Sequence, residues 1–151
     1  MTEKAKQVRN YLRQIKQISI SIRQKKVELA EIRETAQSIS SADTSTEKVS
    51  ASRKSTDAIF VHSIMRMEVL EKKIKDEIAN LSEKKHEMVS RILCLENEVY
   101  SHILIMHYVQ MRDFYDIAAE TGYTYHYVIN LHQKALTAFG EVFMNTEKAV
   151  S

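Results

Sequence analysis

The chain has 151 residues, a length that suits one domain or two small ones, with no proline, no tryptophan, two glycines and one cysteine. Because proline and glycine, the residues that break helices, are so scarce, long helices are favoured. No apolar run is long enough to span a bilayer. Cys94 alone excludes an intrachain disulfide and fits a reducing cytosol. We therefore expect an all-α cytoplasmic protein with no membrane association.

Charge is unevenly distributed, although the net charge is only +2. Residues 1–26 hold eight Lys/Arg and one Glu, whereas residues 107–151 hold three Lys/Arg and five acids. Two interpretations of the basic start remain open. It is either the solvated face of a coiled coil or a surface that contacts phosphates or an acidic partner.

A long amphipathic helix is predicted over about residues 5–39. Its apolar positions alternate by three and four residues, with one polar interruption at Lys25. They are Val8, Tyr11, Ile15, Ile18, Ile22, Lys25, Leu29, Ile32, Ala36 and Ile39. Such a helix cannot bury its stripe alone, so it needs a partner helix.

A Ser/Thr-rich stretch follows at about residues 40–56. These side chains compete with the helix for backbone hydrogen bonds, so we expect a flexible linker that lets the chain reverse direction.

The three/four spacing returns over about residues 57–99, this time with polar positions at Glu71 and Lys85. If the two helices fold back antiparallel, Lys25 faces Glu71 and Tyr11 faces Lys85. A charge in a seam is costly unless it is paired, so this match favours the hairpin over a parallel homodimer. Further dimerisation stays open. The expected coiled-coil contacts are Ile15, Ile18, Ile22, Lys25, Glu71, Ile74, Ile78 and Leu81.

The C-terminal region, about residues 100–140, has the spacing of a helix-turn-helix. Ala118 permits close approach of two helices, Gly122 tolerates the positive φ of a turn, and Val128 points back between the helices. Asp113 and Thr124 are suitable N-caps for the two helices. A plain helical hairpin is the alternative. Residues 1–99 would form the coiled-coil hairpin, and residues 141–151 a flexible tail.

The second helix of this motif presents a polar face. His126, Ile129, Asn130 and Gln133 recur at i, i+3, i+4 and i+7, opposite the apolar Val128 and Leu131. Asn130 could pair with adenine, His126 could donate to guanine, and Ile129 could touch a thymine methyl.

Other chemistry has little support in the sequence. The histidines lack metal-ligand spacing, no second thiol accompanies Cys94, and neither a phosphate loop nor a nucleophile elbow is present. We expect no metal, no cofactor and no enzymatic activity. His62 and His86 are expected at the surface, and His107 is expected to be packed.

The segment YVQMRDFYDIAAETGYTYHYVINLHQKAL resembles region four of bacterial primary sigma factors, which reads the −35 promoter element. The longer arrangement, over about residues 8–139, resembles phage and prophage late-gene transcription regulators of the ArpU and RinA type. The resemblance implies a DNA-binding regulator in a bacterial host, nucleoid-associated, with double-stranded DNA and RNA polymerase as partners.

The family's base-contacting positions fall on Tyr125, His126, Ile129 and Asn130. Thr124, Tyr127 and Lys134 are then placed for phosphate contacts. Gln133 and Arg112 complete the expected DNA-binding residues.

This sequence departs from the sigma pattern in charge. Arg112 and Lys134 are the only Lys/Arg from His107 to Gly140, against Asp113, Asp116 and Glu120. Phosphate neutralisation supplies much of the affinity for DNA. The basic first helix could add contacts, the protein could dimerise, or RNA polymerase could hold it at DNA. In the alternative, the protein binds and modulates another transcription factor through its coiled coil.

Overall fold

The structure, a computed structural model, describes residues 3–42 and 50–150, and every element in these ranges is helical. The all-α prediction is confirmed. In chain order the elements are α1 (Glu3–Leu12), α2 (Gln14–Ala42), α3 (Ser50–Ile92), α4 (Glu98–Leu104), the π-helical turn η1 (Ile105–Val109), α5 (Phe114–Thr121) and α6 (Tyr125–Val150).

The chain divides into two compact units. The first unit comprises Met1–Ile18 and Leu81–Ser151, and the second comprises Ser19–Asn80. The boundary expected near residue 100 therefore falls inside the first unit. Because the N-terminal helix packs with the C-terminal helices, both ends of the chain build the first unit.

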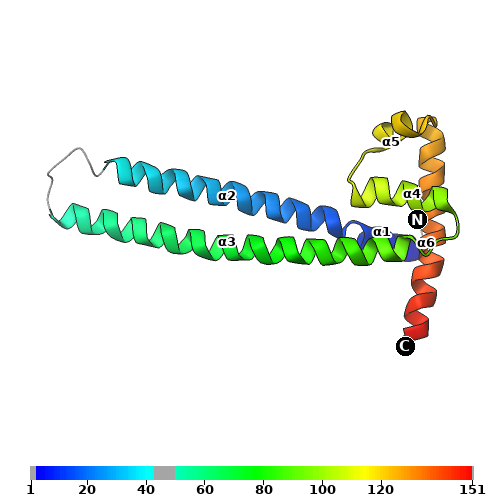
Figure 1. Ribbon diagram of the computed structural model, residues 1–151, viewed down its shortest axis with the longest axis horizontal. Helices are drawn as coiled ribbons and strands as arrows, with labels where there is room; N and C mark the ends of the chain where they lie inside the picture. The colour runs from blue at the N-terminus through cyan, green and yellow to red at the C-terminus, as the bar shows by residue number, and fades with distance from the viewer. Residues whose placement is uncertain (1–2, 43–49, 151) are drawn as a thin grey trace. The chain divides into compact units, whose positions relative to one another are not determined.

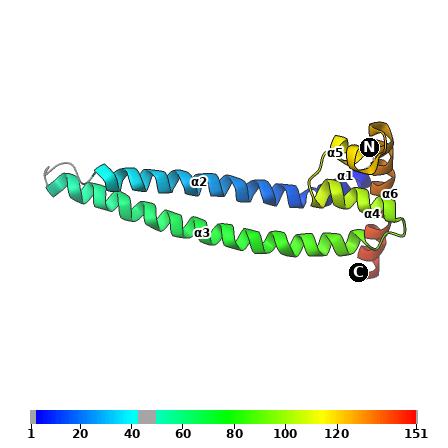
Figure 2. The ribbon, with the colours of Figure 1, turned by 45° about the horizontal axis from the view of Figure 1, so that its top comes forward.

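In the second unit α2 and α3 run antiparallel along each other, as both views show (Figure 1, Figure 2). Their seam is apolar: Ile22, Leu29 and Ala36 of α2 are buried, as are Leu70 and Ile74 of α3. The α2 residues keep the three/four phase that the sequence predicts.

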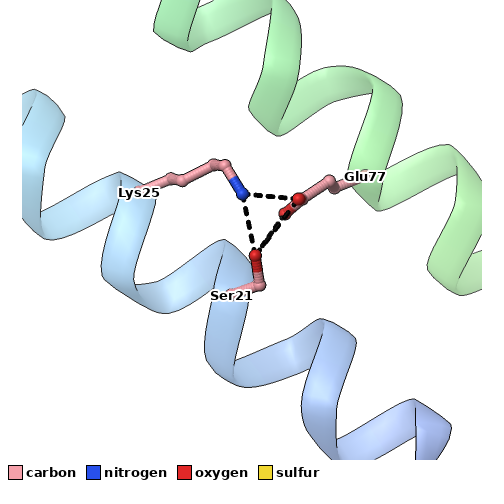
Figure 3. Close-up of polar contacts among 3 residues, drawn as sticks. All are labelled: Ser21, Lys25 and Glu77. Atoms are coloured by element: carbon pink, nitrogen blue, oxygen red, sulfur yellow. Dashed lines mark hydrogen bonds and ion pairs between the residues drawn. The ribbon is translucent and has the colours of Figure 1, made fainter.

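The charge in the α2 seam is paired, but not with the expected residue. The Nζ atom of Lys25 lies 2.5 Å from Oε1 of Glu77, and Ser21 Oγ donates to the same carboxylate at 3.1 Å (Figure 3). The predicted pair of Lys25 with Glu71 is therefore wrong. Glu71 instead accepts from Arg33 at 2.8 Å on the exposed side of the helices.

The α3 seam differs from the predicted one at the same point. Glu77 occupies the seam, whereas Ile78, expected in it, is 45% exposed. Both phases satisfy three/four spacing between Ile74 and Leu81, since either residue can be the intermediate position. Glu77 places a carboxylate where Lys25 and Ser21 can satisfy it, and the cost of leaving Lys25 unpaired at the seam favours this phase.

The core of the first unit joins α1 to α6. Val8, Leu12 and Ile15 pack in one buried cluster with Leu136 and Phe139. The predicted single helix over residues 5–39 is divided at Arg13, and its first part is not a coiled-coil strand paired with α3 alone. Its apolar residues pack in one cluster with Met88 and Ile92 of α3 and with Ala135, Leu136 and Phe139 of α6.

Tyr11 shows the same departure from the predicted register. Its ring lies 5.0 Å from that of Phe143 and 6.0 Å from that of Phe139, and Arg91 lies over it at 5.2 Å. The predicted pairing of Tyr11 with Lys85 is therefore wrong.

Several helices also end at residues other than those predicted. Helix α3 ends at Ile92, earlier than expected, because Asn97 caps a new helix by accepting from the backbone N–H groups of Val99 and Tyr100. Residues 40–42 and 50–56, assigned to the flexible linker, are helical, and the rest of that linker lies outside the described residues.

The expected flexible tail is also helical. Helix α6 continues to Val150, and Val142 and Phe143 pack against the core that α1 and α6 share. Apolar contact with α1 therefore extends the helix past Gly140.

Candidate nucleic-acid interface

The turn between α5 and α6 is built around Gly122. It adopts φ 77°, in the left-handed region, and its N–H donates to the Ala118 carbonyl at 3.0 Å. An added Cβ there would meet nothing within 4 Å, so backbone conformation rather than space requires the glycine. Both ends of the motif are capped as expected. Asp113 Oδ1 accepts from the Asp116 N–H at 2.8 Å, and Thr124 Oγ1 accepts from the Tyr127 N–H at 3.2 Å.

A small apolar core holds the two helices together. Ile117 of α5 and Val128 of α6 are fully buried against Ile103 of α4, with Met106 and Leu131 in the same cluster. Ala118 packs at the edge of this cluster. The start of α6 is therefore fixed by a core on one side.

The other side of that helix faces solvent. Thr124, His126, Tyr127, Asn130, Gln133 and Lys134 are exposed, and Tyr125 and Ile129 are half-buried. The candidate DNA-binding residues on α6 thus share one accessible surface, which we call the reading face, opposite buried Val128 and Leu131. Its polar donors and acceptors could contact base edges or phosphates.

Charge near the reading face is balanced rather than basic. Arg112, expected among the DNA-binding residues, forms an ion pair with Glu120 of α5. Lys134 makes no ion pair with a carboxylate in the part of the chain that the structure describes. Helix α5 and the reading face therefore offer one uncommitted cation, Lys134.

Additional cations come from the N-terminal helices. The charges of Arg9 and Arg13 act on Tyr108 and His132, and those of Arg9, Arg13 and Lys16 act on His107. The first unit thus brings the basic start of the chain beside Tyr108 of η1 and His132 of α6. The sequence shows the basic helix but not what it packs against, because no local signal predicts contacts between residues a hundred positions apart.

A buried polar network lies beneath α6. The Tyr108 hydroxyl and His132 Nε2 are 2.7 Å apart, and the ring of His107 stacks on that of Phe114 at 4.2 Å. Burial is the main cause that lowers the pKa of His132 to about 4, with repulsion from His107 in its protonated form and from Arg9 and Arg13 adding to it. Burial also lowers the pKa of His107. Both histidines are therefore neutral near pH 7.

Tyrosines surround the turn. The ring of Tyr115 stacks on that of Tyr125 at 4.3 Å, and the ring of Tyr123 meets that of Tyr127 edge-on at 4.9 Å. Tyr115 and Tyr123, which the sequence did not single out, are exposed and extend the reading face onto α5 and the turn. Their hydroxyls add donors suited to phosphate oxygens.

A family model described as "Protein of unknown function (DUF1492)" matches residues 38–137. The chain belongs to the DUF1492 family. The part shared with DUF1492 includes the end of α2, all of α3, helix α5, the turn and α6 as far as Thr137, and so contains the reading face. The basic residues Arg9, Arg13 and Lys16 lie outside it. No curated protein and no solved structure matches the chain.

Two features are absent from residues 3–42 and 50–150. No helix there has an apolar stretch sufficient to cross a membrane. No group of three or more His, Cys, Asp or Glu side chains in those ranges could hold a metal ion.

Proposed function

We propose that this protein is a DNA-binding transcription regulator of phage or mobile-element genes, of the ArpU and RinA type, with a sigma region four-like C-terminal motif. The observation that carries the proposal is the reading face. It presents His126, Asn130 and Gln133 to solvent from a helix whose opposite side is locked by Val128. A helix held in this way is the reading element of helix-turn-helix proteins.

The charge distribution favours binding that does not rely on the reading face alone. Few cations on α5 and α6 give few phosphate contacts, and affinity for DNA scales with such contacts. Arg9, Arg13 and Lys16 supply positive charge from the same unit, and RNA polymerase would supply further contacts. DNA recognition would then combine base contacts from α6 with phosphate contacts from elsewhere in the assembly.

Binding to promoter DNA upstream of phage late genes tests this proposal. Fluorescence anisotropy of the full chain, with and without RNA polymerase, should show a saturable complex at low salt. His126→Ala/Asn130→Ala should weaken it at least tenfold, because each good base contact contributes about 1–3 kcal/mol of discrimination. His86→Ala/Asn80→Ala removes the same residue types from exposed sites on α3 and should leave binding intact. Equal loss in both variants would refute the assignment of the reading face.

A second function is favoured by an observation in the second unit. Val61, Met65 and Val69 are each more than half exposed and recur every four residues along α3. Met65 and Val69 also line a pocket of about 390 Å³ with Ile32 of α2. A contiguous apolar strip of this kind is typical of protein-interaction surfaces. The alternative function is therefore that of a module that binds and modulates another transcription factor through the coiled coil.

A pull-down on nuclease-treated host lysate separates the two functions. If the alternative holds, the full chain retains a partner without nucleic acid, and Met65→Glu/Val69→Glu abolishes retention. Ile20→Glu/Val27→Glu places the same charges at exposed apolar sites on α2 and should have little effect. Retention of the same partner by all variants would exclude the α3 strip as the binding surface.

A further inference from the structure

A pocket of about 300 Å³ lies in the first unit and has no lining residue in common with the reading face. It is bounded by η1, by the loop that leads to α5, and by two basic side chains near the start of α2. The lining residues are Arg13, Lys16, His107, Tyr108, Met111, Arg112 and Asp113.

The charged groups of this pocket are mostly cationic. Asp113 is its one acidic residue, and its Oδ1 atom is already bonded to the N–H of Asp116. Arg112 is paired with Glu120. Arg13 and Lys16 are exposed and make no ion pair among the residues that the structure describes. Two cations in a concave site thus lack a counter-ion among the described residues.

The groups behind the pocket indicate a positive potential there. The charges of Lys16, Arg13 and Arg9 lower the pKa of His107 beyond the effect of its burial. Because the Arg112 carbonyl can only accept, His107 Nδ1 donates to it, at 2.8 Å. This hydrogen bond anchors the loop to the His107 ring. A bound anion would relieve the repulsion that these cations exert on one another.

The loop that forms one wall is held in an uncommon conformation. Met111 adopts a backbone φ of 57°, which is unusual for a residue other than glycine. The Gln110 N–H donates to the Ile105 carbonyl at 2.9 Å, and the Arg112 N–H donates to that of Met106 at 3.0 Å. Such strain and such π-helical turns concentrate at functional sites. The wall is thus fixed by backbone bonds before any ligand arrives.

We propose that this pocket binds a phosphate group through Arg13 and Lys16. An arginine fork and a lysine ammonium are the usual donors for phosphate, and their separation by one helical turn lets both reach one ligand. Two sources of that group are possible: a phosphodiester of the DNA backbone or a free phosphorylated small molecule. The DNA source rests on the proposed function, whereas the small-molecule source does not.

Isothermal titration calorimetry of the full chain with pyrophosphate tests the pocket directly. Arg13→Ala/Lys16→Ala should lower the affinity roughly tenfold or more, since each charged hydrogen bond is strong. Arg23→Ala/Lys26→Ala is the matched control: it removes one arginine and one lysine, three residues apart and exposed, from α2 outside the pocket. The control should bind pyrophosphate like the unchanged chain.

The same two variants, titrated with duplex DNA, distinguish the sources. If the DNA backbone occupies the pocket, Arg13→Ala/Lys16→Ala weakens DNA binding, reduces the magnitude of its salt slope by about two, and pyrophosphate competes with DNA. If a small molecule occupies it, pyrophosphate binding depends on the pair while DNA binding does not.

The pocket proposal is overturned if the pocket variant and its control behave alike toward both pyrophosphate and DNA. That outcome leaves the proposed function intact as long as His126→Ala/Asn130→Ala still weakens DNA binding at least tenfold. Conversely, the chain could bind pyrophosphate through Arg13 and Lys16 and yet never bind DNA. That result would support the pocket proposal and refute the proposed function.

Discussion

The Tyr108 hydroxyl lies 2.7 Å from Nε2 of His132, inside the unit that carries the reading face. The two residues are buried and come from η1 and α6. Their hydrogen bond satisfies two polar groups that would otherwise be costly to bury. It also helps to keep His132, one turn after Val128, as a neutral ring. The free energy of unfolding of the first unit should therefore depend on pH.

Stability is therefore expected to fall in mild acid. His132 has a pKa of about 4 in the folded chain and an ordinary value of 6.5 when unfolded. Its contribution is complete above pH 6.5 and is lost as the pH falls toward 4, because only the unfolded chain gains a proton in that window. The full loss is about 3 kcal/mol. Urea unfolding between these limits measures it.

His132→Gln should flatten this pH dependence, because it removes the titrating group. His126→Gln, at an exposed site on the same helix, should keep it. Parallel pH profiles for the two variants would contradict the assignment to His132.

The turn glycine gives a second prediction. Gly122→Ala should destabilise the protein by about 1–2 kcal/mol, because L residues with a Cβ pay that cost in the left-handed region. Gly122→Asn should cost less, since asparagine visits this region more readily. Thermal unfolding measures both. Equal values for the two variants would show that something other than the φ of 77° requires the glycine.

Substitutions at two isoleucines of the motif should affect protein stability and DNA binding differently. Ile117 is fully buried in the core between α4, α5 and α6, so Ile117→Ala should lose about 2–5 kcal/mol of unfolding free energy. Ile129 is half-buried on the reading face, so Ile129→Ala should lose much less stability but should weaken DNA binding. Urea titration and anisotropy measure the two effects. A large stability loss at Ile129 would place it in the core instead.

The seam of the second unit supports a prediction about ion pairs. In double-mutant cycles, Lys25→Met with Glu77→Gln should show stronger coupling than Arg33→Met with Glu71→Gln. The first pair is 26% and 29% exposed, whereas the second is 55% and 52% exposed and more strongly screened by water. Thermal unfolding of the full chain provides the measurement.

The same cycle should depend on pH. The hydrogen bond from Lys25 is the main reason that the pKa of Glu77 lies below its ordinary 4.5. The coupling is therefore present above pH 4.5 and declines as the pH falls through the lowered value. Coupling of equal size in the two pairs, or insensitive to acid, would contradict the assigned seam.

Local patterns in the sequence anticipated much of this architecture. The apolar phase of α2, the caps at Asp113 and Thr124, and the left-handed Gly122 all follow from spacing or residue type within a few positions. These features depend on backbone chemistry that a short segment carries with it. Predictions of this kind need no knowledge of distant partners.

The sequence alone could not decide between two residues that fit the same helical spacing equally well. Glu77 and Ile78 both fit the spacing of α3, and only the position of Lys25 on the facing helix decides between them. The packing of Val8 on Phe139 and the hydrogen bond of Tyr108 to His132 join distant segments of the chain. The pocket of Arg13 and Lys16 depends on that packing, so no motif revealed it.

The most direct test of the reading face is site-specific photo-crosslinking. A photoreactive residue in place of Asn130 should crosslink the full chain to late-gene promoter DNA, alone or with RNA polymerase. The same residue in place of Asn80, which is exposed on α3, should not. Crosslinks from position 130 to protein only, or DNA crosslinks of equal yield from both positions, would contradict recognition of DNA by α6.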